Sequence, residues 1–233
     1  MDKSHINKTY ERLWIRFAKG NKMKYIGYLE LLKIFKVAIQ MTKLPLTCYK
    51  EFNPHKQLSF AMPLSVGMDS LCEYMELLMH KPSKNLIKDL DHQLPEGIRL
   101  LSSYKISKSA PSLLRAVKAA DYRLVFPGVC GSKEYLKNIM SASNIMVLKK
   151  DKNGKKETDI RQDIFNMDFD PVGAVIMRLS AESTRNLNPM LVAQKIFEDM
   201  GICPPLNKIA IVRKEMYGRG EHSKLASLHE VVA

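Results

Sequence analysis

The heptapeptide RLWIRFA, Arg12–Ala18, decides how the first part of this chain folds. Its apolar residues alternate with larger polar or amphipathic ones, and a period of two is typical of a β-strand with one buried face. One face carries Leu13, Ile15 and Phe17; the other carries Arg12, Trp14 and Arg16. Further elements follow in a recognisable order: a helix at 27–41, strands at 57–63 and 73–80, a helix from Ser83 to Pro95, and a strand at 98–106. The order βαββαβ predicts a ferredoxin-like sandwich.

The same order recurs in the second half of the sequence. The expected elements are a strand at 122–126, a helix at 132–141, a hairpin around Asn153-Gly154 whose first strand is 145–149, a strand at 172–179, a helix at 188–200 and a strand at 208–213. We therefore predict an α+β protein of tandem ferredoxin-like sandwiches with antiparallel sheets. The expected division is a first domain at 1–107, a linker at 108–120, a second domain at 121–217 and a tail at 218–233.

The charge balance favours an anionic partner. The formal net charge is +13, and both halves of the 233-residue chain contribute, because residues 1–108 carry 18 Lys/Arg against 10 Asp/Glu. The remainder carries 37 − 18 = 19 against 24 − 10 = 14. A basic excess of this kind indicates nucleic acid first and an anionic membrane surface second. Solubility alone is the alternative explanation.

The first strand and its turn are the strongest candidate for RNA binding. Between residues 12 and 24 there are five cationic residues and no acidic one: Arg12, Arg16, Lys19, Lys22 and Lys24. If the helices cover the face of Leu13, then Trp14 lies on the open face between two guanidinium groups, where an unpaired base could stack on it. The alternative is that this face packs against the second domain, with Trp14 buried and the arginines paired with carboxylates.

The loop Phe52–Lys56, FNPHK, is the second candidate. Asn53, His55 and Lys56 could contact RNA, and the histidine has a side chain whose unperturbed pKa suits proton transfer near neutrality. A metal-independent RNA cleavage could use His55 as the base, with Tyr49 and Lys56 as donor and cation. A histidine that only shapes the loop is the alternative.

The second half offers weaker candidates. Arg161 follows Asp159, and Arg185 precedes a proline-started helix whose N-terminal amides favour an anion. A structural ion pair and an ordinary helix cap are the alternatives. The lysines of KKDKNGKK, residues 149–156, could form a solvated hairpin tip or touch backbone phosphates.

Several classes of site are not expected. The cysteines Cys48, Cys72, Cys130 and Cys203 are scattered singly, so buried free thiols are expected rather than metal ligands. We expect no metal and no cofactor. The chain shows no signal peptide and no apolar run of ~18 residues, so the cytoplasm is the expected location.

Several segments together resemble a bacterial radical-SAM-associated family known only as a domain of unknown function. They are IRFAKGNKMKYIGYLELLKIFKVAIQMTKLPL at 15–46, FNPHKQLSFAMPLSVG at 52–67, LPEGI at 94–98, SAPSL at 109–113 and DIRQ at 159–162. The resemblance runs from residue 12 to about 217. It implies association with a cobalamin-binding radical-SAM protein and with RNA metabolism, and no established activity. Glu51, Lys56 and Gln162 depart from the family's pattern, and the chain has no CxxxCxxC for an iron–sulfur cluster of its own.

Three functions remain open at this point. The first is an RNA-binding accessory protein that presents ribosomal or transfer RNA to a radical-SAM enzyme, without catalysis of its own. The second is a metal-independent endoribonuclease that uses His55. The third is a protein-interaction module for the radical-SAM partner that makes no RNA contact.

Overall fold

The strand predicted at residues 12–18 is β1, Glu11–Lys19, and it pairs antiparallel with a neighbour on each side. The computed structural model that shows this describes residues 10–42, 44, 58–80, 82–127, 133–151, 154–220 and 224–231. The neighbours are β3, Asp69–Met79, and β4, Ile98–Ile106. A short strand, β2, Leu58–Phe60, pairs with the other edge of β3, so the first half has the strand order β4-β1-β3-β2.

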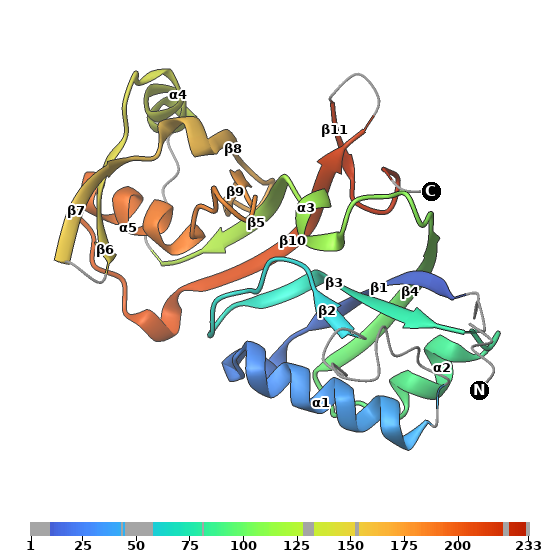
Figure 1. Cartoon of the computed structure of the whole chain (residues 1–233). Helices are drawn as coiled ribbons and strands as arrows, with labels where there is room; N and C mark the ends of the chain where they lie inside the picture. Colours follow the sequence, from blue (N-terminus) through green and yellow to red (C-terminus); the bar gives the residue numbers. More distant parts are fainter. Residues whose placement is uncertain are drawn as a thin grey trace, which may run out of the picture.

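Two helices cover one face of this half, α1, Tyr28–Met41, and α2, Leu86–Asp91 (Figure 1). A 3₁₀ turn, η1, Asn21–Tyr25, leads from β1 into α1. The apolar stripe of α1 packs against the β1 residues that the alternation placed on the buried face. Phe17 and Phe35 have ring centroids 5.0 Å apart, and Phe60 of β2 completes the aromatic cluster. The predicted polarity of this face is therefore confirmed.

The second half repeats the strand order with other strands, β10-β5-β9-β8. These strands are β5, Ala119–Val125; β8, Ile164–Phe169; β9, Val175–Ser180; and β10, Ala210–Arg219. The helices are α4, Lys133–Ser141, and α5, Pro189–Asp199, and Asn188 caps α5 by accepting a hydrogen bond from the Met190 N–H at 2.9 Å. A separate hairpin is formed by β6, Met146–Asp151, and β7, Gly154–Asp159.

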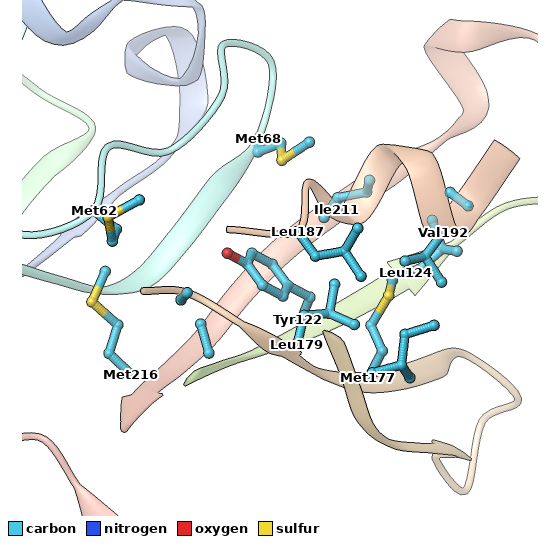
Figure 2. Close-up of a cluster of buried hydrophobic side chains, with 14 of the residues drawn as sticks. Met62, Met68, Tyr122, Leu124, Met177, Leu179, Leu187, Val192, Ile211 and Met216 are labelled. Atoms are coloured by element: carbon cyan, nitrogen blue, oxygen red, sulfur yellow. The ribbon is translucent and has the colours of Figure 1, made fainter. Parts of the chain in front are cut away.

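One parallel contact joins the two halves into a single sheet. β10 pairs with the start of β3 through Val212 opposite Asp69 and Arg213 opposite Ser70. The α+β class is confirmed, but the antiparallel sheets expected for the two halves are joined into one mixed sheet of nine strands within the described residues. A shared core accompanies this junction: Met62 and Met68 of the first half lie near Tyr122, Leu187 and Met216 of the second (Figure 2).

Local patterns did not predict several short elements, and β8 among them lies at the outer edge of the second half. They are α3, Leu113–Ala116; η3, Arg161–Asp163; β8; η4, Leu206–Lys208; and β11, Leu225–Ser227. Leu113 of the expected linker and Leu228 of the expected tail are both buried. The proposed domain boundaries stay a prediction. No helix among the described residues is long and apolar enough to cross a membrane.

Candidate functional site

The β1 face that carries Trp14 lies inside the protein. Trp14 is 0 % exposed, and its Nε1 donates a hydrogen bond to Glu76 Oε2 at 2.7 Å. Neighbours in the same core include Leu113 of α3 and Leu228 beyond β11. The prediction that the indole lies on an open face is wrong, because α3 and the C-terminal segment pack over that face. No base can stack on a ring that is fully enclosed.

Arg12 is held inside the same layer. Its guanidinium forms an ion pair with Glu76 at 2.8 Å, and it also donates to the carbonyl oxygens of Ser107, Ala110 and Pro111 at 3.0, 2.7 and 3.0 Å. Only 7 % of the residue is exposed. Through these bonds the guanidinium group holds residues 107–111, which belong to the segment that connects the two halves. Arg12 is therefore a structural residue, and its prediction as an exposed phosphate ligand is wrong.

Arg16 ties the first half to β10. Its Nη2 lies 2.8 Å from Glu215 Oε2, and the Cys72 thiol donates to the other oxygen of that carboxylate at 2.9 Å. Burial, followed by the hydrogen bond and the charge of Glu215, raises the pKa of Cys72 to about 12. The thiol is therefore a neutral donor at physiological pH.

The C-terminal strap, residues 224–231, completes this cover. His229 stacks on Tyr104 with ring centroids 5.1 Å apart, and its Nδ1 lies 3.2 Å from the Tyr74 hydroxyl oxygen. Leu228 is 0 % exposed and its N–H donates to the Met216 carbonyl at 2.9 Å. The strap is thus part of the fold and occupies the sheet surface on which the sequence suggested RNA.

A cleft opens at the other end of β1, where the two halves meet. This junction cleft has a volume of about 530 Å³ and is lined by Ala18, Lys19, Gly20, Asn21, Asp69, Ser70, Leu71, Arg123, Val212 and Lys214. Three of these residues carry positive charge and one carries negative charge. Asp69 lies 3.7 Å from Lys24 of η1, and Arg123 pairs with Asp170 at 2.6 Å. Of the predicted basic turn, Lys19 lines the cleft, and Lys24 lies beside it through its contact with Asp69.

Lys19 is the unusual residue of the junction cleft. It is 3 % exposed, and no hydrogen bond or ion pair joins its ammonium group to another residue in the described part of the chain. The nearby carboxylate of Glu73 is bound at 2.8 Å by Arg213, which is itself 2 % exposed and contacts the Tyr122 hydroxyl. Burial lowers the pKa of Lys19, and Arg213 lowers it further, whereas Glu73 and Asp69 oppose the shift.

The remaining predicted residues are dispersed. Lys22 is exposed on η1. Arg161 donates to the carbonyl oxygens of Met140 and Ile164 at 2.6 and 3.0 Å, and Arg185 forms an ion pair with Asp163. Both arginines thus bind groups of the protein itself. Tyr49, Asn53, His55 and Lys56 lie outside the described residues.

The predicted hairpin around Gly154 is confirmed, and it brings four lysines into register. The β6–β7 pairing places Lys149 opposite Lys156 and Lys150 opposite Lys155. Lys149, Lys155 and Lys156 are exposed. We call residues 146–159 the lysine hairpin. The sequence showed the lysines but could not show which pairs face each other, because that depends on the register of the turn.

No local signal marked Asp69, Arg123 or Lys214 as site residues, because each lies on a different strand and they meet only through the β3–β10 junction. Among the described residues, no group of three or more His, Cys, Asp or Glu side chains could hold a metal ion.

The geometry defines an α+β protein with one mixed sheet, a cation-lined cleft at the junction of its halves and a lysine-rich hairpin outside the sheet. Residues 12–189 match the model of DUF2344, described as an uncharacterized protein conserved in bacteria. The chain therefore belongs to the DUF2344 family, which agrees with the resemblance to a domain of unknown function. No curated protein matches the chain.

Proposed function

We propose that this protein binds RNA through its phosphate backbone and that the lysine hairpin makes the principal contact. The observation that carries the proposal is the register of Lys149 with Lys156 and of Lys150 with Lys155. Like charges directly opposite each other on paired strands are destabilising. A phosphate backbone along the hairpin would offset this repulsion, so the arrangement suits a bound polyanion better than the protein alone.

The surroundings of the hairpin leave Lys149, Lys155 and Lys156 available for a ligand. β6 and β7 form a two-stranded sheet of their own, and Val147 anchors the base of the hairpin at 8 % exposure. The ten ion pairs among the described residues do not include Lys149, Lys155 or Lys156. Since every internal pair cancels one charge of each sign, the net charge of +13 is carried by cations such as these. Phosphate contacts of this kind supply affinity without base specificity.

The finer assignment combines the fold with the sequence resemblance. The strand orders β4-β1-β3-β2 and β10-β5-β9-β8, each with helices between the strands, support two ferredoxin-like units in tandem. The resemblance to a radical-SAM-associated family supports an accessory role, in which the protein presents ribosomal or transfer RNA to a cobalamin-binding radical-SAM enzyme. Within the described residues no observation favours an RNA-cleaving centre, and His55 lies outside them.

Salt-dependent RNA binding tests the proposal. Filter binding of total RNA at about 50 and about 200 mM salt should show a steep loss of affinity, because each neutralised phosphate releases counterions. The double variant Lys149→Gln/Lys156→Gln should weaken binding and lower the slope of log K against log salt by about 1.4 to 1.8, that is about 0.7 to 0.9 per lost contact.

Lys84→Gln/Lys88→Gln is the matched control, because it removes the same charge from two exposed lysines in and beside α2. It should leave the slope nearly unchanged. Absence of RNA binding at the lower salt concentration, or equal losses in the two double variants, would reject the hairpin as the principal contact. Co-purification of a radical-SAM enzyme that survives nuclease and high salt would instead favour a protein-interaction module without RNA contact.

A further inference from the structure

We propose that the surface around the start of α1 binds an unpaired base of single-stranded RNA, with Tyr25 as the ring on which the base stacks. The inference rests on the proposed RNA binding and deepens it, because it names the class of RNA. It concerns a surface separate from the lysine hairpin, which we call the tyrosine patch: Tyr25, Tyr28, Leu29 and Val66. A phosphate contact does not require an unpaired base, whereas a stacking surface does.

The first argument is the exposure of the tyrosine patch. The exposed fractions are 66 % for Tyr25, 63 % for Leu29, 59 % for Val66 and 41 % for Tyr28. Exposed apolar side chains that are scattered singly need no explanation, but a group of four on adjoining segments indicates a binding surface. Exposed aromatic rings are the surfaces on which RNA-binding proteins stack unpaired bases.

The second argument is the set of contacts that holds these segments together. The patch combines residues of η1, of the first turn of α1 and of the turn between β2 and β3 that carries Val66. The N–H of Gly67 in that turn donates to the Lys24 carbonyl oxygen at 2.7 Å, which holds the turn against η1. Tyr28 packs edge-to-face on Phe60 of β2, with ring centroids 5.9 Å apart. The patch therefore lies on elements that are bonded or packed to one another.

The third argument is the charge around the patch. Residues 20–42 contain four lysines and one glutamate, a net charge of 4 − 1 = +3. Lys22 and Lys33 are exposed, and Lys33 lies one helical turn after the last patch residue of α1. The Lys24 ammonium nitrogen lies 5.4 Å from the centroid of the Tyr25 ring, and most of that tyrosine stays accessible. The phosphates next to a stacked base would therefore meet cations.

The same lysines favour RNA over a protein partner. Protein interfaces are enriched in aromatic residues but depleted in lysine. Here an ammonium group lies over the most exposed ring of the patch, and lysines outnumber acidic residues by four to one in residues 20–42. Each nucleotide of a single strand supplies both an aromatic face for the ring and a negative charge for the lysines. The tyrosine patch therefore suits single-stranded RNA.

The test compares two ligands of equal length for the full chain by fluorescence anisotropy. One is a short oligouridylate, and the other is an oligomer of abasic spacers that keeps the phosphates and lacks the bases. Wild type should bind the oligouridylate at least about fivefold more tightly, which corresponds to about 1 kcal/mol for one stacked base. Tyr25→Ala should lose that factor on the oligouridylate and lose nothing on the abasic oligomer, and Tyr25→Trp should retain it.

The salt dependence separates the tyrosine patch from the lysine hairpin. Stacking releases no counterions, so Tyr25→Ala should lower the affinity while it leaves the slope of log K against log salt unchanged. The hairpin double variant should lower that slope. Phe165→Ala is the matched control, because Phe165 is 46 % exposed on β8, at the far edge of the sheet. It should change neither affinity nor slope, and the thermal midpoint of Tyr25→Ala should equal that of wild type.

Two results would overturn the inference: equal affinities of wild type and Tyr25→Ala for the oligouridylate, or equal affinities of wild type for the two oligomers. If the hairpin double variant still lowers the slope, the hairpin proposal survives that failure. If Tyr25→Ala weakens binding and the hairpin double variant does not, the hairpin is rejected and the tyrosine patch is retained. Absence of RNA binding by wild type would reject both.

Discussion

Trp14 Nε1 donates to Glu76 Oε2 at 2.7 Å, and the same oxygen lies 2.8 Å from Arg12 Nη2. One carboxylate on β3 therefore satisfies two donors of β1 that are otherwise enclosed. An indole N–H without an acceptor in this layer would lose a hydrogen bond that water cannot replace. This shared acceptor explains why a strand with a cationic and aromatic face can be internal.

Replacement of Glu76 by alanine is expected to destabilise the protein strongly. The change leaves the Trp14 N–H unpaired and the Arg12 guanidinium without its counter-charge, and breaking a buried pair of this kind costs about 3–5 kcal/mol. Urea unfolding measures the difference. Glu11→Ala is the control, because Glu11 pairs with Lys105, whose side chain is 69 % exposed, and such surface pairs contribute about 0–1 kcal/mol. Equal losses in the two variants would contradict the role given to Glu76.

The two thiols that the structure describes are expected to react at very different rates. Cys72 is fully buried with a pKa of about 12, whereas Cys203 is exposed. Because the thiolate is the reactive form, alkylation of the native protein near pH 8 should modify Cys203 and spare Cys72. Mass spectrometry of the digested protein measures the two sites separately, and alkylation in urea is the control that must reach both. Rapid labelling of Cys72 in the folded state would show that the Glu215 contact opens readily.

Local patterns predicted the first half of the fold well because its elements are set by short-range periodicity. The alternation in Arg12–Ala18 gave the correct face for Leu13, Ile15 and Phe17, and strand β4 has the bounds expected for it. The strand order of the second half includes β8, which was not predicted, whereas the predicted hairpin strand β6 lies outside the main sheet. The contact between the halves could not be predicted in this way. It rests on two β3–β10 residue pairs that lie more than 140 positions apart in the chain.

The error about Trp14 has the same origin. Alternation fixes which side chains share a face, but the cover of that face comes from α3 and the C-terminal strap, which carry no strong periodic pattern. One signal was present in the sequence: β3 contains Glu73 and Glu76 within an apolar run. Carboxylates inside an apolar strand indicate buried cations nearby, and each of these two is paired with an arginine, Arg213 and Arg12. That signal favoured the alternative in which the face of Trp14 packs inside the protein and the arginines pair with carboxylates.

The C-terminal strap is expected to contribute to stability as a core element. Leu228 is 0 % exposed, and truncation of a buried leucine to alanine costs about 2–5 kcal/mol. Leu228→Ala should therefore lower the free energy of unfolding by an amount in that range, measured by urea titration. Leu206→Ala is the matched control, since Leu206 is 82 % exposed and should change stability by less than about 0.5 kcal/mol. A neutral Leu228→Ala would mean that the strap is loosely held and that Trp14 and Tyr74 are more accessible than the structure shows.

The last prediction concerns Gly97, which positions the turn at the edge of the junction cleft. Gly97 has a φ of +96°, its carbonyl oxygen accepts a hydrogen bond from Gly20 N at 2.8 Å, and a Cβ added to it would lie 2.6 Å from the Gly20 carbonyl oxygen. Alanine at this position must therefore displace the backbone of Gly20, which lines the cleft.

Gly67 provides the matched control. It has a similar φ of +90°, but a Cβ there would meet nothing within 4 Å. Gly67→Ala should lose about 1–2 kcal/mol through the backbone conformation alone. Gly97→Ala should lose more, because the contact with Gly20 adds to the same conformational cost. Urea unfolding of both variants measures the difference. Equal free energies of unfolding for the two variants would mean that the turn shifts without an energetic penalty. The close approach of Gly97 to Gly20 would then have no part in shaping the cleft.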